Sequence, residues 1–116
     1  MIKRIDANEV DQRMRISKFI ILLEALPEKY FNQGHLPGAM NVPHDISDNK
    51  ILEILPDRTA EIITYCANRP CANSEILAER LVELGYKNVL DFYDGKEGWV
   101  KSGRHLVRSE PPTLKP

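Results

Sequence analysis

The decisive stretch of this chain reads Ile62-Ile63-Thr64-Tyr65-Cys66-Ala67-Asn68-Arg69-Pro70-Cys71-Ala72-Asn73-Ser74 and continues to Gly85. Its β-branched start predicts a buried strand over 61–65, and the apolar spacing over 73–84 predicts a helix that Gly85 ends. Cys66 is therefore expected where a strand ends and a helix approaches. Backbone N–H groups at such a junction favour an anion, so the thiol can ionise near neutral pH, and the thiolate is the nucleophile.

The composition indicates one globular domain. The chain has 116 residues, of which 42% are hydrophobic and 28% charged, and its net charge is −1. This charge generates no field that would attract nucleic acid or an anionic membrane, so we expect neither as a partner. The longest apolar run, 19–23, is too short to cross a bilayer, and the first residues do not resemble a signal peptide. We therefore expect a cytoplasmic protein.

Strand and helix patterns alternate along the sequence. Strands are predicted over 2–5, 19–23, 39–42, 61–65 and 89–93. Helices are predicted over 7–15, 49–55 and 73–84, with a short helical turn over 97–102 and mostly loop over 27–43. This alternation predicts an α/β fold with a largely parallel sheet. In such sheets the active site lies at the carboxyl ends of the strands, where Cys66 is expected.

Three segments together resemble the rhodanese family. They are Leu22-Leu23-Glu24-Ala25 followed by Gly34-His35-Leu36-Pro37-Gly38-Ala39-Met40-Asn41-Val42-Pro43, then the Cys66 loop with its helix, and finally Asp91 to Gly103 with Gly95, Gly98 and Trp99. The resemblance implies a rhodanese-like fold, in which helices flank both faces of a central, mostly parallel five-stranded sheet. It implies a single domain over 1–107, followed by a proline-containing tail over 108–116.

The same resemblance implies a sulfurtransferase that carries sulfur as a persulfide on Cys66. The donor would be thiosulfate or another persulfide. The acceptor would be cyanide or a thiol, including the thiol of a thioredoxin or of a sulfur-carrier protein. No cofactor is implied. The active-site loop would consist of Ala67, Asn68, Arg69, Pro70, Cys71 and Ala72. We expect its backbone N–H groups to form a cradle that stabilises negative charge on the sulfur, as an oxyanion hole does for oxygen.

The sequence departs from the family pattern in the loop and in the first signature. Glu24 stands where the family usually has Asp, and we expect it to be buried and paired. Arg69 replaces a small residue and is expected to bind an anionic donor or lower the pKa of Cys66. Pro70 has no N–H, and the loss of a donor worth about 1.5–3 kcal/mol would raise the thiol pKa by about one to two units. Ala72 replaces the arginine that phosphatases of this fold use to clamp phosphate, so phosphatase activity is not expected.

Cys71 has two interpretations. It is either a small residue without a role or a resolving thiol that attacks the persulfide on Cys66, which would make the protein a two-cysteine redox protein or reductase. Bridging requires the two Cα atoms to approach within about 7 Å. A structural disulfide is not expected in the cytoplasm, and a zinc site would need two further ligands with suitable spacing. A non-catalytic regulatory module is a third hypothesis, which the presence of Cys66 disfavours.

Overall fold

The computed structural model describes residues 2–109, so most of the predicted tail lies outside the described residues. The strands are Lys3–Ile5 (β1), Ile21–Glu24 (β2), Met40–Asn41 (β3), Glu61–Tyr65 (β4) and Asn88–Phe92 (β5). The helices are Ala7–Ile16 (α1), Glu28–Gln33 (α2), Asp48–Ile54 (α3), Asn73–Glu83 (α4) and Gly95–Lys101 (α5). Within the described residues no helix is both long and apolar enough to span a bilayer.

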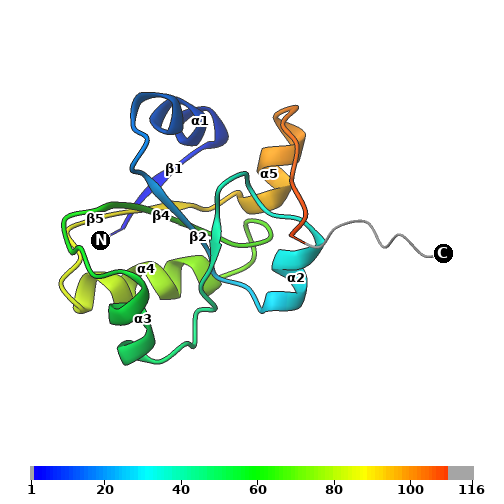
Figure 1. The fold of residues 1–116 in the computed structure, drawn as a ribbon. Helices are drawn as coiled ribbons and strands as arrows, with labels where there is room; N and C mark the ends of the chain where they lie inside the picture. The colour runs from blue at the N-terminus through cyan, green and yellow to red at the C-terminus, as the bar shows by residue number, and fades with distance from the viewer. Residues whose placement is uncertain (1, 110–116) are drawn as a thin grey trace.

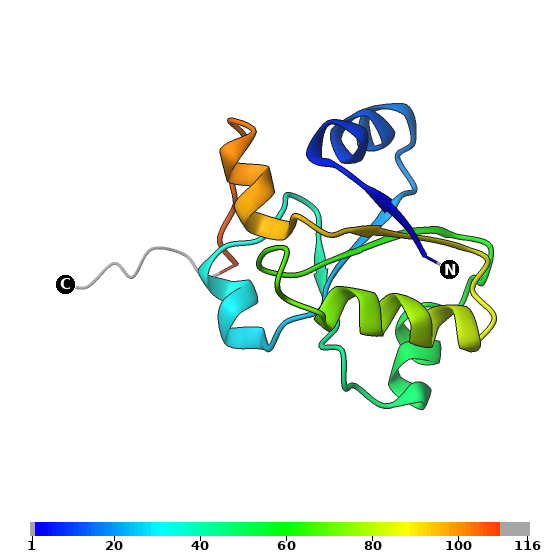
Figure 2. The ribbon, with the colours of Figure 1, turned by 180° about the vertical axis from the view of Figure 1, so that it is seen from behind.

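All five strands run parallel in one sheet of order β1-β5-β4-β2-β3. In Figures 1 and 2, α1 and α5 lie on one side of the sheet, and α3 and α4 on the other. This arrangement confirms the predicted α/β fold with helices on both faces of a five-stranded sheet. The strand that carries Cys66, β4, is the central strand, so its carboxyl end has a neighbouring strand on each side.

Two hydrophobic cores lie on opposite faces of the sheet, because successive strand residues point to opposite faces. Ile63 packs with Val10 and Trp99 in the core beneath α1 and α5. Its neighbour Ile62 packs with Leu77 and other residues of α3 and α4. Burial on both faces explains why the adjacent residues Ile62 and Ile63 of β4 are both apolar.

The predicted elements agree with the structure best where an apolar pattern is long. β4 has the predicted bounds, and Asp6 caps α1 by accepting a hydrogen bond from the Glu9 N–H at 2.9 Å. The strand predicted over 19–23 is shifted to 21–24, because its ladder with β4 begins at Ile21 and leaves Phe19 85% exposed. α3 begins at Asp48, one residue before the predicted start, and Ser47 caps it because the Ser47 hydroxyl accepts from the Lys50 N–H.

One helix was not expected. The segment 27–43, predicted to be mostly loop, contains α2, which has six residues and none of them buried. A short helix without a buried face produces no apolar periodicity, so this pattern carries no helical signal. The helical turn predicted over 97–102 begins earlier, at Gly95.

Candidate active site

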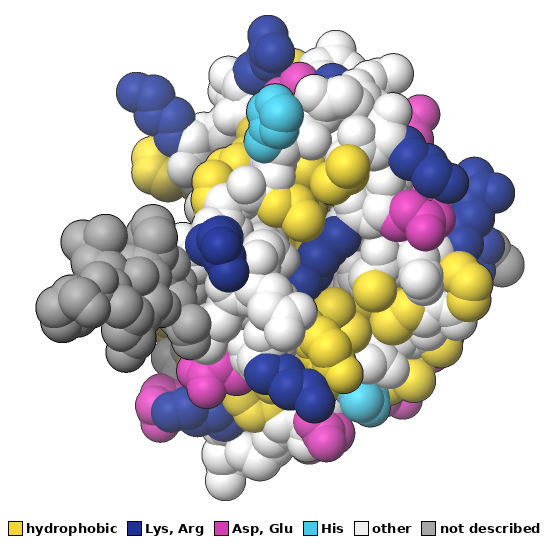
Figure 3. Space-filling view, turned by 90° about the vertical axis from the view of Figure 1, so that its right-hand side faces the viewer, with side chains coloured by type: hydrophobic (Ala, Val, Ile, Leu, Met, Phe, Trp, Pro, Cys, Tyr) yellow, Lys and Arg dark blue, Asp and Glu magenta, His cyan; other side chains and the backbone are white. Residues whose placement is uncertain are grey.

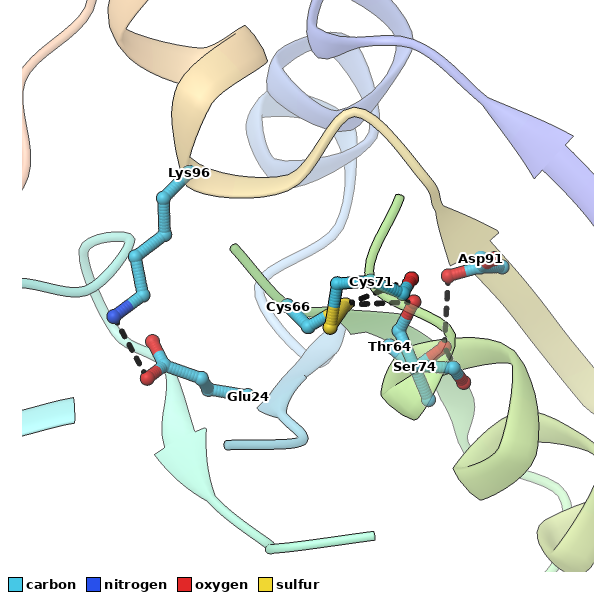
Figure 4. The surroundings of a disulfide bond; sticks show 7 residues. All are labelled: Glu24, Thr64, Cys66, Cys71, Ser74, Asp91 and Lys96. Atoms are coloured by element: carbon cyan, nitrogen blue, oxygen red, sulfur yellow. Dashed lines mark hydrogen bonds and ion pairs between the residues drawn. A yellow bond between two sulfur atoms is a disulfide. The ribbon is translucent and has the colours of Figure 1, made fainter. Parts of the chain in front are cut away.

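Cys66 follows the last residue of β4 and is 1% exposed. The loop 67–72 leads from it to α4, as the sequence predicts. Figure 4 shows Cys66 between two buried carboxyl groups, Glu24 on one side and Asp91 on the other. The carboxyl ends of parallel strands β2, β4 and β5 therefore meet at this cysteine.

The first turn of α5 holds the start of the loop in place. The N–H of Lys96 donates to the Cys66 carbonyl at 3.0 Å, and the N–H of Glu97 donates to the Ala67 carbonyl at 2.9 Å. Gly95 makes this approach possible, because it has a φ of +63° and a Cβ there would overlap the Cys66 carbonyl oxygen. Only glycine adopts this backbone conformation without strain. Gly95, which belongs to the third segment of the family resemblance, therefore has a direct role in shaping the loop.

The loop itself turns through Arg69 and Pro70. The Cys71 N–H donates to the Asn68 carbonyl at 3.2 Å and is therefore used within the turn. Within residues 2–109, four other loop amides have no hydrogen-bond acceptor: those of Ala67, Asn68, Arg69 and Ala72. These amides are the donors that a bound anion can use.

Cys66 and Cys71 are joined in a disulfide, with their Cα atoms 6.5 Å apart. A structural disulfide was not expected, whereas a disulfide between Cys66 and a resolving Cys71 was one of the two interpretations of Cys71, and this bond is present in the structure. The five-residue separation brings the two thiols together because the turn at Arg69 and Pro70 folds the loop back. The geometric condition for a resolving role of Cys71 is met.

The polar surroundings of the Cys66 sulfur differ from the predicted cradle in this disulfide form. Its Sγ lies 3.3 Å from the Cys71 carbonyl oxygen and 3.5 Å from the Ser74 hydroxyl oxygen. No loop amide of the described residues donates to it. The carbonyl can only accept, so near this sulfur it disfavours negative charge, whereas the Ser74 hydroxyl can either donate or accept.

The Arg69 side chain contacts Tyr93 and Asp94, which connect β5 to α5. Its Nε lies 2.5 Å from Oδ1 of Asp94, and its guanidinium stacks 4.7 Å from the Tyr93 ring centroid. The hydrogen bond to Asp94 raises the pKa of Arg69, which stays charged. Since the Arg69 side chain is 66% exposed, this ion pair is weak and can exchange Asp94 for an anionic ligand.

Glu24, at the end of β2, is fully buried, as expected, and has two partners. Tyr65 donates to its Oε1 at 2.8 Å, and Lys96 Nζ lies 2.8 Å from its Oε2 as an ion pair rather than a well-directed hydrogen bond. Lys96 also donates to the Tyr30 carbonyl at 2.9 Å. Burial raises the pKa of Glu24, and the contacts with Lys96 and Tyr65 oppose this shift in part. This site ties β2, β4, α2 and α5 together.

Asp91, on β5, is 1% exposed and has hydroxyl partners instead. The Thr64 hydroxyl lies 3.3 Å from its Oδ1, and the Ser74 side chain also hydrogen bonds to its carboxyl. Burial raises the pKa of Asp91, and these two hydrogen bonds offset only part of the shift. Sequence analysis did not select Asp91 or Ser74, although a carboxyl in the middle of a buried strand is a detectable signal.

The face above the strand ends is hollowed. In Figure 3, apolar side chains surround a depression in which a basic side chain is visible. In the part of the chain that the structure describes, no group of three or more His, Cys, Asp or Glu side chains is arranged to hold a metal ion. The loop amides without acceptors and the exposed Arg69 side chain are groups that suit a small anion.

Comparison with known proteins identifies the family. The model of the rhodanese-like domain matches residues 6–102. The chain belongs to the rhodanese-like domain family. This confirms the resemblance inferred from the three sequence segments, and it covers Cys66, its loop and both flanking carboxyl groups.

The relatives include sulfurtransferases. A sulfurtransferase of Allochromatium vinosum is 27% identical over 110 residues, which are 95% of this chain and 99% of that protein. The adenylyltransferase and sulfurtransferase UBA4 of Candida albicans is 32% identical over 100 residues, 83% of this chain but 23% of UBA4. A crystal structure of thiosulfate sulfurtransferase from Pseudomonas aeruginosa superposes with a TM-score of 0.82 at 24% identity, covering 94% of this chain and 21% of that one. The chain thus spans about a quarter or less of the last two proteins and nearly all of the first.

Proposed function

We propose that the chain is a sulfurtransferase in which Cys66 carries sulfur as a persulfide. The observation that carries this proposal is the position of Cys66 at the carboxyl end of the central strand. The loop that follows it has amides at 67, 68, 69 and 72 without acceptors among residues 2–109. Family membership and the sulfurtransferase named among the relatives support the same chemistry. Unused amides suit a persulfide because its terminal sulfur bears negative charge at neutral pH.

The proposed reaction has two displacement steps. In the first, the Cys66 thiolate attacks the outer sulfur of thiosulfate, the bond between the two sulfur atoms of thiosulfate breaks, and sulfite leaves with the electron pair. In the second, an acceptor thiolate attacks the terminal sulfur of the persulfide, and Cys66 leaves as a thiolate. Arg69 would assist the first step by exchanging Asp94 for the dianionic donor.

The donor and acceptor classes are part of this proposal. Another persulfide can replace thiosulfate as donor, and cyanide, a thioredoxin or a sulfur-carrier protein can act as acceptor. A cytoplasmic location belongs to the same proposal, because Cys66 must be kept reduced to act as a nucleophile.

Intact mass spectrometry tests the assignment of Cys66. The reduced protein, incubated with thiosulfate, should gain about 32 Da, the mass of one sulfur atom, and should lose it on addition of dithiothreitol. Cys66→Ser should gain no mass and transfer no sulfur to cyanide, whereas Cys71→Ser serves as the matched cysteine control and should still gain the sulfur. Full transfer activity in Cys66→Ser would overturn the proposal.

A second candidate function follows from the disulfide. Cys71 thiolate can attack the inner sulfur of the Cys66 persulfide, forming the Cys66–Cys71 disulfide and releasing hydrosulfide, after which an external dithiol reduces the protein. The 6.5 Å Cα separation favours this step. Without reductant, wild-type protein should then lose 2 Da relative to its reduced form and release sulfide, while Cys71→Ser should accumulate the persulfide. Equal sulfide release by both proteins would exclude this cycle.

A further inference from the structure

A row of buried polar side chains lies next to Cys66, on the side away from the Glu24–Lys96 pair (Figure 4). The proposed sulfur transfer does not use these side chains. Ser74 and Asp91 are each 1% exposed. The Ser74 hydroxyl oxygen lies 3.5 Å from the Cys66 sulfur, and the same side chain hydrogen bonds to the Asp91 carboxyl. One hydroxyl therefore connects the thiol to a carboxyl group.

The two charged groups near Asp91 act in opposite directions, since Glu75 raises its pKa and Arg4 lowers it. Arg4 pairs with Asp91 in the β1–β5 ladder, but the Arg4 guanidinium binds Glu75 at 3.1 Å and its side chain is 56% exposed. Among residues 2–109, Asp91 has no ion pair. On the other side of Cys66 the charges of Lys96 and Glu24 oppose each other. Burial is therefore the largest cause of the raised pKa of Asp91.

The Thr64 hydroxyl is consistent with a carboxyl group that can hold a proton. Its Oγ1 lies 3.0 Å from the Ser74 carbonyl and 3.3 Å from Oδ1 of Asp91. A hydroxyl has one proton, and the shorter contact is with the carbonyl, which can only accept. When Thr64 donates to that carbonyl, its oxygen is free to accept a hydrogen bond from a protonated Asp91.

We propose that Asp91 is a positioning residue that takes up the proton of the Cys66 thiol through the Ser74 hydroxyl. The thiol donates its proton to Ser74 Oγ, and the Ser74 hydroxyl proton passes to the Asp91 carboxylate. The S–H bond of Cys66 breaks, an O–H bond forms on Asp91, and Ser74 ends unchanged with its O–H directed at the thiolate. No other reactant is needed. This inference rests on the proposed function only in making Cys66 the nucleophile.

The two sites then titrate as a coupled pair. The singly protonated pair already contains reactive thiolate when the proton resides on Asp91, so wild-type Cys66 should react well below the pH at which a free thiol ionises, about 8.5. When Asp91 cannot accept a proton, Cys66 must lose its proton to solvent. The difference should disappear in alkaline solution, where the thiolate forms without help.

The test is the pH dependence of Cys66 alkylation, which needs no sulfur donor and so can fail independently of the proposed function. The full chain, reduced with dithiothreitol and desalted, is treated with iodoacetamide from pH 5 to 10, and fragmentation mass spectrometry separates label on Cys66 from label on Cys71. In Asp91→Asn, Cys66 should be alkylated at least ~10-fold more slowly than in wild type at pH 6, a factor smaller than a direct general base contributes. At pH 9.5 the two rates should agree within about twofold. Ser74→Ala should behave in the same way, and it carries the test if Asp91→Asn does not fold.

Two control variants separate proton transfer from a structural role. Glu79→Gln removes an exposed carboxylate from the same helix as Ser74 and should keep the wild-type profile. Thr64→Ser keeps the hydroxyl that faces Asp91, and it should keep the reactivity at pH 6 even if stability falls. Equal or faster alkylation of Asp91→Asn at pH 6, an equal slowing at every pH, or a wild-type profile for Ser74→Ala would each overturn the proposal.

Discussion

The two buried carboxyl groups that flank Cys66 differ in their partners. Glu24, on the β2 side, has a lysine and a tyrosine as partners, whereas Asp91, on the β5 side, has two hydroxyl groups as its partners in the described part of the chain. Burial raises the pKa of both. A cation close to a buried carboxylate makes the pair a structural tie that is costly to break, whereas hydroxyl partners can reorient and leave the carboxyl group free to exchange a proton. The comparison therefore separates a structural side from a chemical side of the same site.

The largest effect should come from removing the cation on the structural side. Lys96→Met leaves Glu24 buried without its partner, and breaking a buried pair in this way costs about 3–5 kcal/mol. Urea unfolding followed by circular dichroism at pH 7 measures the loss. Lys101→Met, on the same helix with a side chain that is 76% exposed, should change the free energy of unfolding by less than about 1 kcal/mol. A loss below about 1 kcal/mol for Lys96→Met would remove the distinction between the two sides.

A smaller effect should appear in the pH dependence of stability on the chemical side. Because the pKa of Asp91 is higher in the folded than in the unfolded state, its contribution to stability is fully present below the unfolded pKa and is lost as pH rises through the folded pKa. Asp91→Asn lacks this loss. Relative to wild type, its free energy of unfolding should therefore increase as pH rises from 3.5 to 7, as measured by urea titrations.

Asp11 supplies the opposite sign as a control. Hydrogen bonds from Arg15 and Arg104 lower its pKa, so its stabilising contribution is present above the unfolded pKa and is lost as pH falls. Relative to wild type, the free energy of unfolding of Asp11→Asn should therefore decrease as pH rises from 3.5 to 7. If both variants drifted in the same direction, the assignment of a raised pKa to Asp91 would be wrong.

The smallest effect on stability should come from Arg69, which lies outside both buried sites. Arg69→Ala breaks only an exposed ion pair and should leave the urea midpoint unchanged. If Arg69 binds the anionic donor, the KM for thiosulfate should rise about threefold, the size expected for an exposed charge contact, with little change in kcat. Steady-state transfer to cyanide measures both constants, and an unchanged KM would assign Arg69 to the loop structure alone.

The sequence predicted the fold well because its strongest patterns are local. A strand buried on both faces has apolar residues at adjacent positions, as Ile62 and Ile63 do, so β4 and the cysteine after it can be recognised in the sequence. Glu24 was expected to be buried and paired, but its partner Lys96 was not identified. Lys96 comes from the far end of the chain and meets Glu24 only because the parallel sheet places β2 and the start of α5 at one edge. Polar residues within β4 and β5, namely Thr64 and Asp91, were the available signal for the second site.

The sequence by itself determined the rhodanese-like fold, the position of Cys66 between a strand and a helix, and the loop of residues 67–72 that follows it. These features depend on local apolar periodicity and on the conformations that glycine and proline allow. Only the tertiary structure decided that Cys66 and Cys71 lie within bridging distance, and that Glu24 is paired with a cation while Asp91 is bound by hydroxyl groups. The reason is physical: the pKa of a buried group depends on which distant side chains share its low-dielectric surroundings, and chain spacing does not specify them.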